Sequence, residues 1–226
     1  MKRRYKMKKF LSILAVLLFV LGGMSNLAAA NGNNKQDAQV RILHASPDAP
    51  AVDVYVDGNV AVEGAKFKDA TDYLMLPAGP HKVEIYPAGK KDQPVIAQQL
   101  EVEGGKAYTV AAVNKLANLE MIAVEDTRKA PKGKAFTRVG HLSPDAPQVD
   151  VGVIKGDTVF SELSFKDISV YQELEPGTYD LEIRTPEGKQ VLDLSGTKLE
   201  KDTVYSVFAV NTADKLEVIV LVDSEK

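Results

Sequence analysis

Histidine and aspartate side chains that could take part in acid–base or metal chemistry gather in one short segment of the sequence and again 97 residues later. They are His44, Asp48 and Asp53 in the first segment and His141, Asp145 and Asp150 in the second. Imidazole and carboxylate groups can ligate zinc, carboxylates with loop carbonyls can ligate calcium, and beside Ser46 the histidine and aspartate could serve as the base and the acid of a hydrolase. These six residues are the candidate binding residues of the chain.

The ligand set in each segment is nevertheless sparse. Zinc needs three converging nitrogen, sulfur or carboxylate ligands, whereas each segment offers one histidine and the chain has no cysteine. The dense D-x-D-x-D-G loop of calcium sites is absent, and no G-x-S-x-G elbow is present to expose a serine nucleophile. We therefore expect no metal, no cofactor, no catalytic residue and no enzyme activity. The alternative is an extracellular metal-binding protein or hydrolase that uses these His/Asp loops.

The local sequence favours a structural role for the histidine. Ser46-Pro47-Asp48-Ala49 is typical of a turn with proline at its second position, and Pro50 then forces an extended conformation on the residue before it. His44 shares strand parity with Ile42, which predicts that its ring points inward or towards the turn. The turn carbonyls or Asp48 are then the nearest hydrogen-bond partners for its nitrogens.

The two segments belong to a tandem repeat. Residues 41–54 and 138–151 are identical at ten of fourteen positions, and the correspondence continues to the end of each copy. We predict β-sandwich copies at 40–126 and 135–223, a basic Pro/Gly-containing linker at 127–134 and a flexible tail at 31–39. Residues 36–127 and 134–226 are each expected to fold alone.

Apolar and polar residues alternate with a period of two in both copies, which is typical of half-buried strands. Segments 52–56, 81–86, 149–153 and 180–184 follow this pattern, and turn residues recur every ten residues or so. Nearly continuous apolar runs at 108–113, 205–210 and 217–222 predict central strands. Together these features predict an all-β chain of two tandem antiparallel immunoglobulin-like β-sandwich domains. Tyr108 and Tyr205 would each form a tyrosine corner.

The repeated H-x-S-P-D-A-P-x-V-D segment, with its leucine–(proline)–glycine turn, resembles the bacterial exported domain of unknown function 4397. The resemblance covers nearly all of residues 40–223, and both copies carry the motif in full. It implies a β-sandwich in a secreted or cell-envelope protein, and it implies no activity for any residue.

The N-terminal residues predict export. Six Lys and Arg residues lie in the first nine positions, an apolar run follows at 10–21, and Ala28-Ala29-Ala30 fits a signal-peptidase site. We expect a signal peptide at 1–30 that is cleaved after Ala30, and retention as an N-terminal anchor is the alternative. No second apolar run follows, so we expect no membrane span after cleavage.

Charge restricts the partners. Without residues 1–30, 22 Lys and Arg face 31 Asp and Glu, and the net charge is −9. A chain this acidic has no electrostatic reason to bind nucleic acid. We expect a secreted or cell-envelope protein, monomeric, acting as a non-catalytic binding or structural module for an unknown extracellular or cell-wall ligand.

Overall fold

Strands dominate the structure, a computed structural model that describes residues 36–224. The predicted signal peptide and residues 31–35 of the predicted tail lie outside the described residues. The first copy comprises β1 (Ala38–His44), β2 (Val52–Val56), β3 (Asn59–Ala65), β4 (Leu74–Leu76), β5 (Gly79–Pro87), β6 (Ile96–Val102), β7 (Ala107–Val113), a 3-10 turn η1 (Leu116–Asn118) and β8 (Glu120–Asp126).

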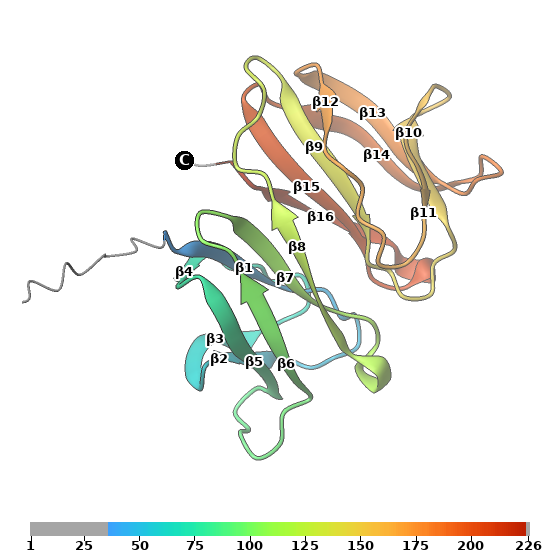
Figure 1. Cartoon of the computed structure of the whole chain (residues 1–226). Helices are drawn as coiled ribbons and strands as arrows, with labels where there is room; N and C mark the ends of the chain where they lie inside the picture. The colour runs from blue at the N-terminus through green and yellow to red at the C-terminus, as the bar shows by residue number, and fades with distance from the viewer. Residues whose placement is uncertain (1–35, 225–226) are drawn as a thin grey trace, which may run out of the picture. The chain divides into compact units, whose positions relative to one another are not determined.

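The second copy repeats this order (Figure 1). It comprises β9 (Ala135–His141), β10 (Val149–Val153), β11 (Thr158–Leu163), β12 (Gln172–Leu174), β13 (Gly177–Arg184), β14 (Gln190–Leu199), β15 (Thr203–Val210), η2 (Ala213–Lys215) and β16 (Glu217–Val222). Segment 127–134, predicted as the linker, contains no strand. Strand β1 begins at Ala38, inside the segment predicted as the tail.

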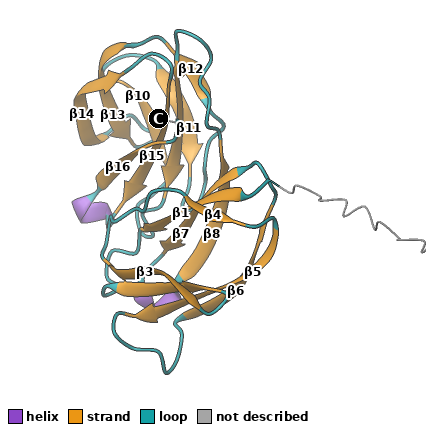
Figure 2. Ribbon diagram, turned by 90° about the vertical axis from the view of Figure 1, so that its left-hand side faces the viewer, coloured by secondary structure: helices purple, strands orange, loops and turns teal. Residues whose placement is uncertain are grey.

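Each copy has two four-stranded sheets, which confirms the predicted sandwich class (Figure 2). The first copy has sheets β4-β1-β7-β8 and β3-β2-β5-β6, and the second has β12-β9-β15-β16 and β11-β10-β13-β14. Pairing is antiparallel except between β1 and β7 and between β9 and β15, which run parallel. Apolar residues of both sheets, such as Ile42 and Val54, fill the core of the first copy.

The tyrosine corners form as predicted. The Tyr108 hydroxyl accepts a hydrogen bond from the Glu103 amide at 3.2 Å, and the Tyr205 hydroxyl accepts one from the Glu200 amide at 3.1 Å. Each tyrosine thus fixes the loop that leads into its own strand.

One strand prediction is wrong. The run 217–222 was expected in the middle of a sheet, but β16 is an edge strand, and Val220 and Val222 are about half exposed. A continuous apolar run is typical of burial on both faces, but it does not reveal whether another strand follows on the far side. The other two runs, β7 and β15, are interior strands as expected.

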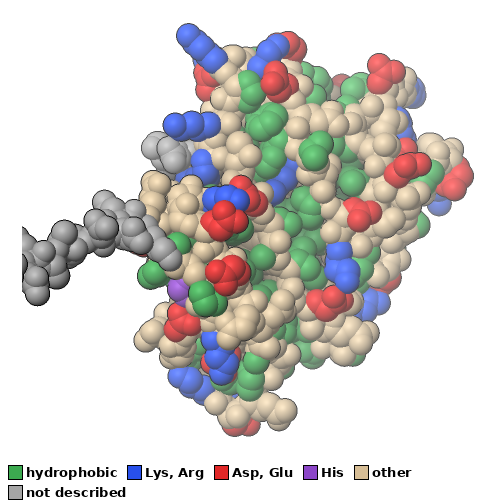
Figure 3. All heavy atoms as spheres, in the orientation of Figure 1, with side chains coloured by type: hydrophobic (Ala, Val, Ile, Leu, Met, Phe, Trp, Pro, Cys, Tyr) green, Lys and Arg blue, Asp and Glu red, His purple; other side chains and the backbone are tan. Residues whose placement is uncertain are grey.

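A separate apolar cluster joins the two copies. Its buried members are Leu43, Ala45, Ala111 and Val113 of the first copy and Leu142, Phe208, Val210 and Ile219 of the second. Ala45, Ala111 and Val113 correspond to Leu142, Phe208 and Val210, 97 residues later, so the two copies meet through corresponding surfaces. On the face drawn in Figure 3, acidic and basic side chains are interspersed. None of the helices in residues 36–224 has the length and apolar character needed to cross a bilayer.

Candidate functional site

The motif histidines are buried and bind the turn that follows them. His44 Nε2 lies 3.2 Å from the Pro50 carbonyl oxygen, and His141 Nε2 lies 3.0 Å from the Pro147 carbonyl oxygen. Each ring can donate to its carbonyl only through a protonated Nε2. Exposure of the two side chains is 1% and 0%. The predicted inward orientation is correct, and the partners are turn carbonyls rather than the motif aspartates.

The first motif aspartate of each copy accepts a hydrogen bond from a backbone amide of the 3-10 turn in the same copy. Asp48 accepts the Leu116 amide at 2.7 Å, and Asp145 accepts the Ala213 amide at 2.9 Å. Both amides lie at the start of a 3-10 turn, where backbone donors lack partners within the turn. Asp145 also pairs with Lys115 of the first copy at 2.7 Å, and this hydrogen bond holds the pKa of the carboxyl below its usual range.

The second motif aspartate holds a β-bulge. Asp53 accepts the Gly64 amide at 2.7 Å, and Asp150 accepts the Glu162 amide at 2.7 Å. Both amides lie where the register of the adjoining strand shifts, in β3 and β11. Asp53 also accepts the Gly89 amide at 2.8 Å, so its two oxygens are both engaged.

The structure does not bring the candidates together as a ligand set. Within residues 36–224 no group of three or more His, Asp and Glu side chains is placed to hold a metal ion. The Oγ atoms of Ser46 and Ser143 are buried without a partner, as are the Nδ1 atoms of the motif histidines. Binding of a ligand by the six candidate residues stays a prediction.

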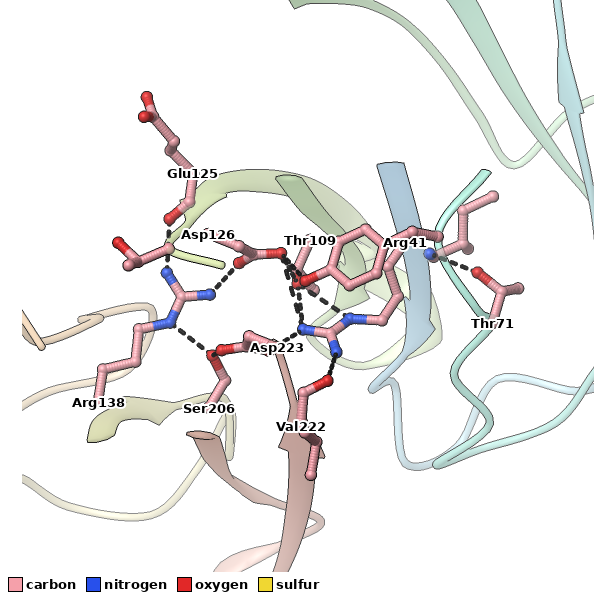
Figure 4. Close-up of polar contacts among 12 residues, drawn as sticks. Arg41, Thr71, Thr109, Glu125, Asp126, Arg138, Ser206, Val222 and Asp223 are labelled. Atoms are coloured by element: carbon pink, nitrogen blue, oxygen red, sulfur yellow. Dashed lines mark hydrogen bonds and ion pairs between the residues drawn. The ribbon is translucent and has the colours of Figure 1, made fainter. Parts of the chain in front are cut away.

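Sequence reasoning missed a polar network between the copies (Figure 4). Arg41 of β1 donates to Asp223 across the boundary at 2.6 Å, and Arg138 of β9 binds Asp126 in the same way. The pairs are equivalent, because each arginine and each aspartate has its counterpart 97 residues away. All four side chains are at most 4% exposed. The shared 97-residue spacing of the arginines and aspartates is visible in the sequence, but it does not indicate that the pairs form between the copies.

Hydroxyl groups complete the network. Thr109 and Tyr73 donate to Asp126, each at 2.7 Å, and Ser206 and Tyr171 donate to Asp223 at 2.5 and 2.9 Å. Burial and the neighbouring carboxylates raise the pKa of Tyr73 well above its usual range. Each buried carboxylate therefore has several donors, as a charge removed from water requires.

A second feature missed from the sequence is an apolar cavity inside the second copy. It has a volume of about 100 Å³ and lies between the two sheets, where Phe160 and Leu181 face Val207 and Val218. The corresponding cavity of the first copy has about 20 Å³. At three equivalent core positions the second copy has a smaller or more polar residue. Val40, Leu100 and Met121 in the first copy correspond to Thr137, Thr197 and Val218 in the second.

Comparisons with solved structures find 11 matching chains. The C-terminal domain of AlgF from P. aeruginosa is 23% identical, with 40% of this chain and 99% of that chain covered and a TM-score of 0.34. The family CBM26 domain of Eubacterium rectale Amy13K, solved with maltoheptaose, is 11% identical, with 82% and 96% covered and a TM-score of 0.26. A cell adhesion protein of Bacteroides fragilis, described as putative, is 11% identical, with 83% and 98% covered and a TM-score of 0.22. The search of curated proteins found no match.

Two tandem β-sandwiches that carry the same motif define a duplicated β-domain protein. The family model for the domain of unknown function (DUF4397) matches residues 38–152 and 152–226. The chain belongs to this family, as the resemblance of the motif predicted. The division at residue 152 falls within β10, whereas the strand pairing divides the copies at segment 127–134.

Proposed function

We propose that the chain is an exported, non-catalytic binding or structural module in which the repeated motif is a structural clasp. The carrying observation is that the motif side chains make the same hydrogen bonds in both copies. In each copy the histidine binds the proline carbonyl, one aspartate binds the 3-10 turn and the other binds the bulge. A segment used identically in two places to fix its own loop fits architecture better than chemistry.

Burial supports this proposal against the hydrolase alternative. A nucleophilic serine must reach its substrate, and Ser46 and Ser143 are 0% exposed. The metal alternative would need the carboxylates free to converge, whereas these carboxylates accept backbone amides on different elements.

The proposal includes export through a cleaved signal peptide, which the charge step at residue 9 and the Ala28-Ala29-Ala30 site support. The exported chain should begin at Asn31 and act in the medium or the cell envelope on an extracellular or cell-wall ligand. Intact-mass analysis of the secreted fraction tests this. A chain in the membrane pellet that retains residues 1–30 would contradict it.

Unfolding measurements on His44→Ala and His141→Ala test the clasp. Each change leaves a buried carbonyl without its donor, so each should lower the free energy of unfolding by about 1–3 kcal/mol. The loss should be the same with a chelator and with millimolar calcium or zinc. Stabilisation of the unsubstituted protein by metal, lost on substitution of either histidine, would contradict the proposal.

Ser46→Ala is the matched control in the same loop. The hydroxyl it removes has no partner, so stability should change far less than in His44→Ala. Hydrolysis of a simple ester by the unsubstituted protein, abolished in Ser46→Ala/Ser143→Ala, would support the hydrolase alternative instead.

A further inference from the structure

We propose that the cavity between the sheets of the second copy binds a small, largely apolar molecule about the size of benzene that carries one hydroxyl group. The proposal deepens the proposed function, because it gives the non-catalytic binding module a site and a ligand class. The cavity has about 100 Å³, and aliphatic and aromatic side chains supply most of its wall. An apolar protein cavity of about 150 Å³ stays dry and takes up benzene, so this size suits a single ring or a short alkyl chain.

One polar atom in the wall is the reason to expect a hydroxyl group on the ligand. Thr137 is 5% exposed and lines the cavity, and its Oγ1 has no hydrogen-bond partner. The other polar side chains of the wall are engaged: Tyr179 donates to the Glu175 carbonyl, Thr197 to the Leu194 carbonyl and Lys198 to Glu200, and the Tyr205 hydroxyl accepts the Glu200 amide. A buried hydroxyl without a partner is costly, and a ligand that hydrogen-bonds to it removes that cost.

The first copy shows that the fold does not require the cavity. At the position of Thr137 it has Val40, and at the position of Val218 it has the larger Met121, both buried in a core with a cavity of about 20 Å³. Empty apolar space destabilises a domain in proportion to its volume. The second copy thus carries a destabilising feature that its own repeat avoids, which a ligand would explain.

The edge of the sheet provides a place of entry. Strand β14 is an edge strand, and its pairing with β13 shifts register between Leu194 and Thr197, where Ser195 and Gly196 form a bulge. Its counterpart β6 pairs with β5 without a shift. Bulges are frequent beside binding sites because they interrupt pairing locally, and Thr197 and Lys198 directly after this bulge line the cavity.

Titration of the purified protein with benzene and with phenol, followed by backbone amide NMR, tests the site. Both probes should shift the amides of Val207 and Val218 and leave those of Val110 and Met121 unchanged. Phenol should bind about fivefold tighter than benzene, because one hydrogen bond to Thr137 is worth about that factor.

Two substitutions taken from the first copy separate the contributions. Thr137→Val should keep benzene binding and lose the preference for phenol. Val218→Met should fill the cavity, abolish binding of both probes and leave the protein at least as stable. Unchanged spectra with both probes, equal binding by Val218→Met, or a phenol preference that survives Thr137→Val would each overturn the proposal. The histidine variants of the clasp do not touch this cavity, so failure here and failure of the proposed function give different results.

Discussion

At the scale of single residues, His81 shows how one side chain makes a copy sensitive to pH. Its Nδ1 lies 2.7 Å from Asp57 Oδ2 and its Nε2 lies 2.7 Å from the Pro77 carbonyl oxygen. Both partners are acceptors, so both nitrogens must carry protons for the two hydrogen bonds to form. Burial disfavours the charged ring, but the Pro77 carbonyl and Asp57 together outweigh it and raise the pKa of His81 above its usual value of 6.5.

The raised pKa predicts a loss of stability in mild alkali. A group whose pKa is higher in the folded state contributes stability below its unfolded pKa of about 6.5, and the contribution disappears as pH rises through the folded pKa. The melting temperature should therefore fall as pH rises from about 6 through the raised pKa of His81. Melting curves across this range measure the effect.

His81→Tyr is the matched variant, because Tyr179 occupies the equivalent position and donates to the Glu175 carbonyl at 2.7 Å. In this variant the melting temperature should fall less with rising pH than in the unsubstituted protein. An equal fall in both proteins would show that His81 is not the titrating group.

At the scale of elements, the bulges held by the motif aspartates differ in one informative way. Gly64 in β3 has φ +63°, and Glu162, its counterpart in β11, has φ +58°. The left-handed region is accessible to glycine but strained for a residue with a side chain, at a cost of about 1–2 kcal/mol. The first copy has the residue that suits its bulge, and the second does not.

Exchange of these residues should therefore shift stability in opposite directions. Gly64→Ala should lower the free energy of unfolding by about 1 kcal/mol, and Glu162→Gly should raise it by a similar amount. Steric clash does not contribute to the expected loss in Gly64→Ala, since no atom outside the neighbouring residues lies within 4 Å of a Cβ placed on Gly64. Chemical denaturation of both variants measures the change, and shifts of the same sign would contradict the explanation.

The elements also show what could be predicted from the sequence. Period-two segments such as 52–56 and 149–153 became β2 and β10 with the predicted bounds, because alternation reflects burial of one strand face. Short strands such as β4 and β12 were missed, because three residues are too few to show a period. The burial of His44 followed from strand parity, but its proline carbonyl partner depends on how the loop folds back.

At the scale of the whole molecule, the buried arginine–aspartate pairs stabilise the contact between copies. Arg138 donates to three partners: Asp126, the Glu125 carbonyl and Ser206. Removal of one member of such a network leaves a buried charge without its partner, and this is far more costly than loss of an exposed pair.

Two ion pairs between the copies allow a direct comparison. Arg138→Met should lower the free energy of unfolding by about 3–5 kcal/mol, because Asp126 stays buried. Lys68→Met removes a pair with Glu217 whose side chains are both more than 40% exposed, and it should cost less than about 1 kcal/mol. Chemical denaturation measures both. Similar losses in the two variants would mean that the buried network adds nothing specific.

Separate folding of the copies stays a prediction, and the contact between them adds an expectation to it. Fragment 36–127 would expose the apolar cluster around Leu43 and Val113, together with Arg41. The fragments should therefore fold and then associate with each other when mixed, which sedimentation measures as a one-to-one complex. A fragment that stays unfolded without the other would contradict separate folding of the copies.

The equivalence of the contacts across this boundary has a consequence for the ancestry of the chain. Arg41 meets Asp223 as Arg138 meets Asp126, and Lys68 meets Glu217 as Lys166 meets Glu120, which is the pattern of a self-complementary dimer with a two-fold axis. We infer that a single-domain ancestor paired with itself before its gene was duplicated and fused. In a symmetric dimer every mutation occurs on both sides, but fusion lets each half change alone.

In the apolar cluster between the copies, equivalent positions now carry different residues. Leu43 pairs with Ala111 in the first copy, whereas Gly140 pairs with Phe208 in the second, so the large side chain has moved to the neighbouring strand. A Cβ on Gly140 would clash with Ile168 Cδ1 and lie 2.6 Å from the Phe208 ring, so a larger residue at this position does not fit beside Phe208 and Ile168 as they lie. Descendants of the ancestor that still have one domain should therefore form homodimers, while each half of this chain should bind the other half in preference to itself.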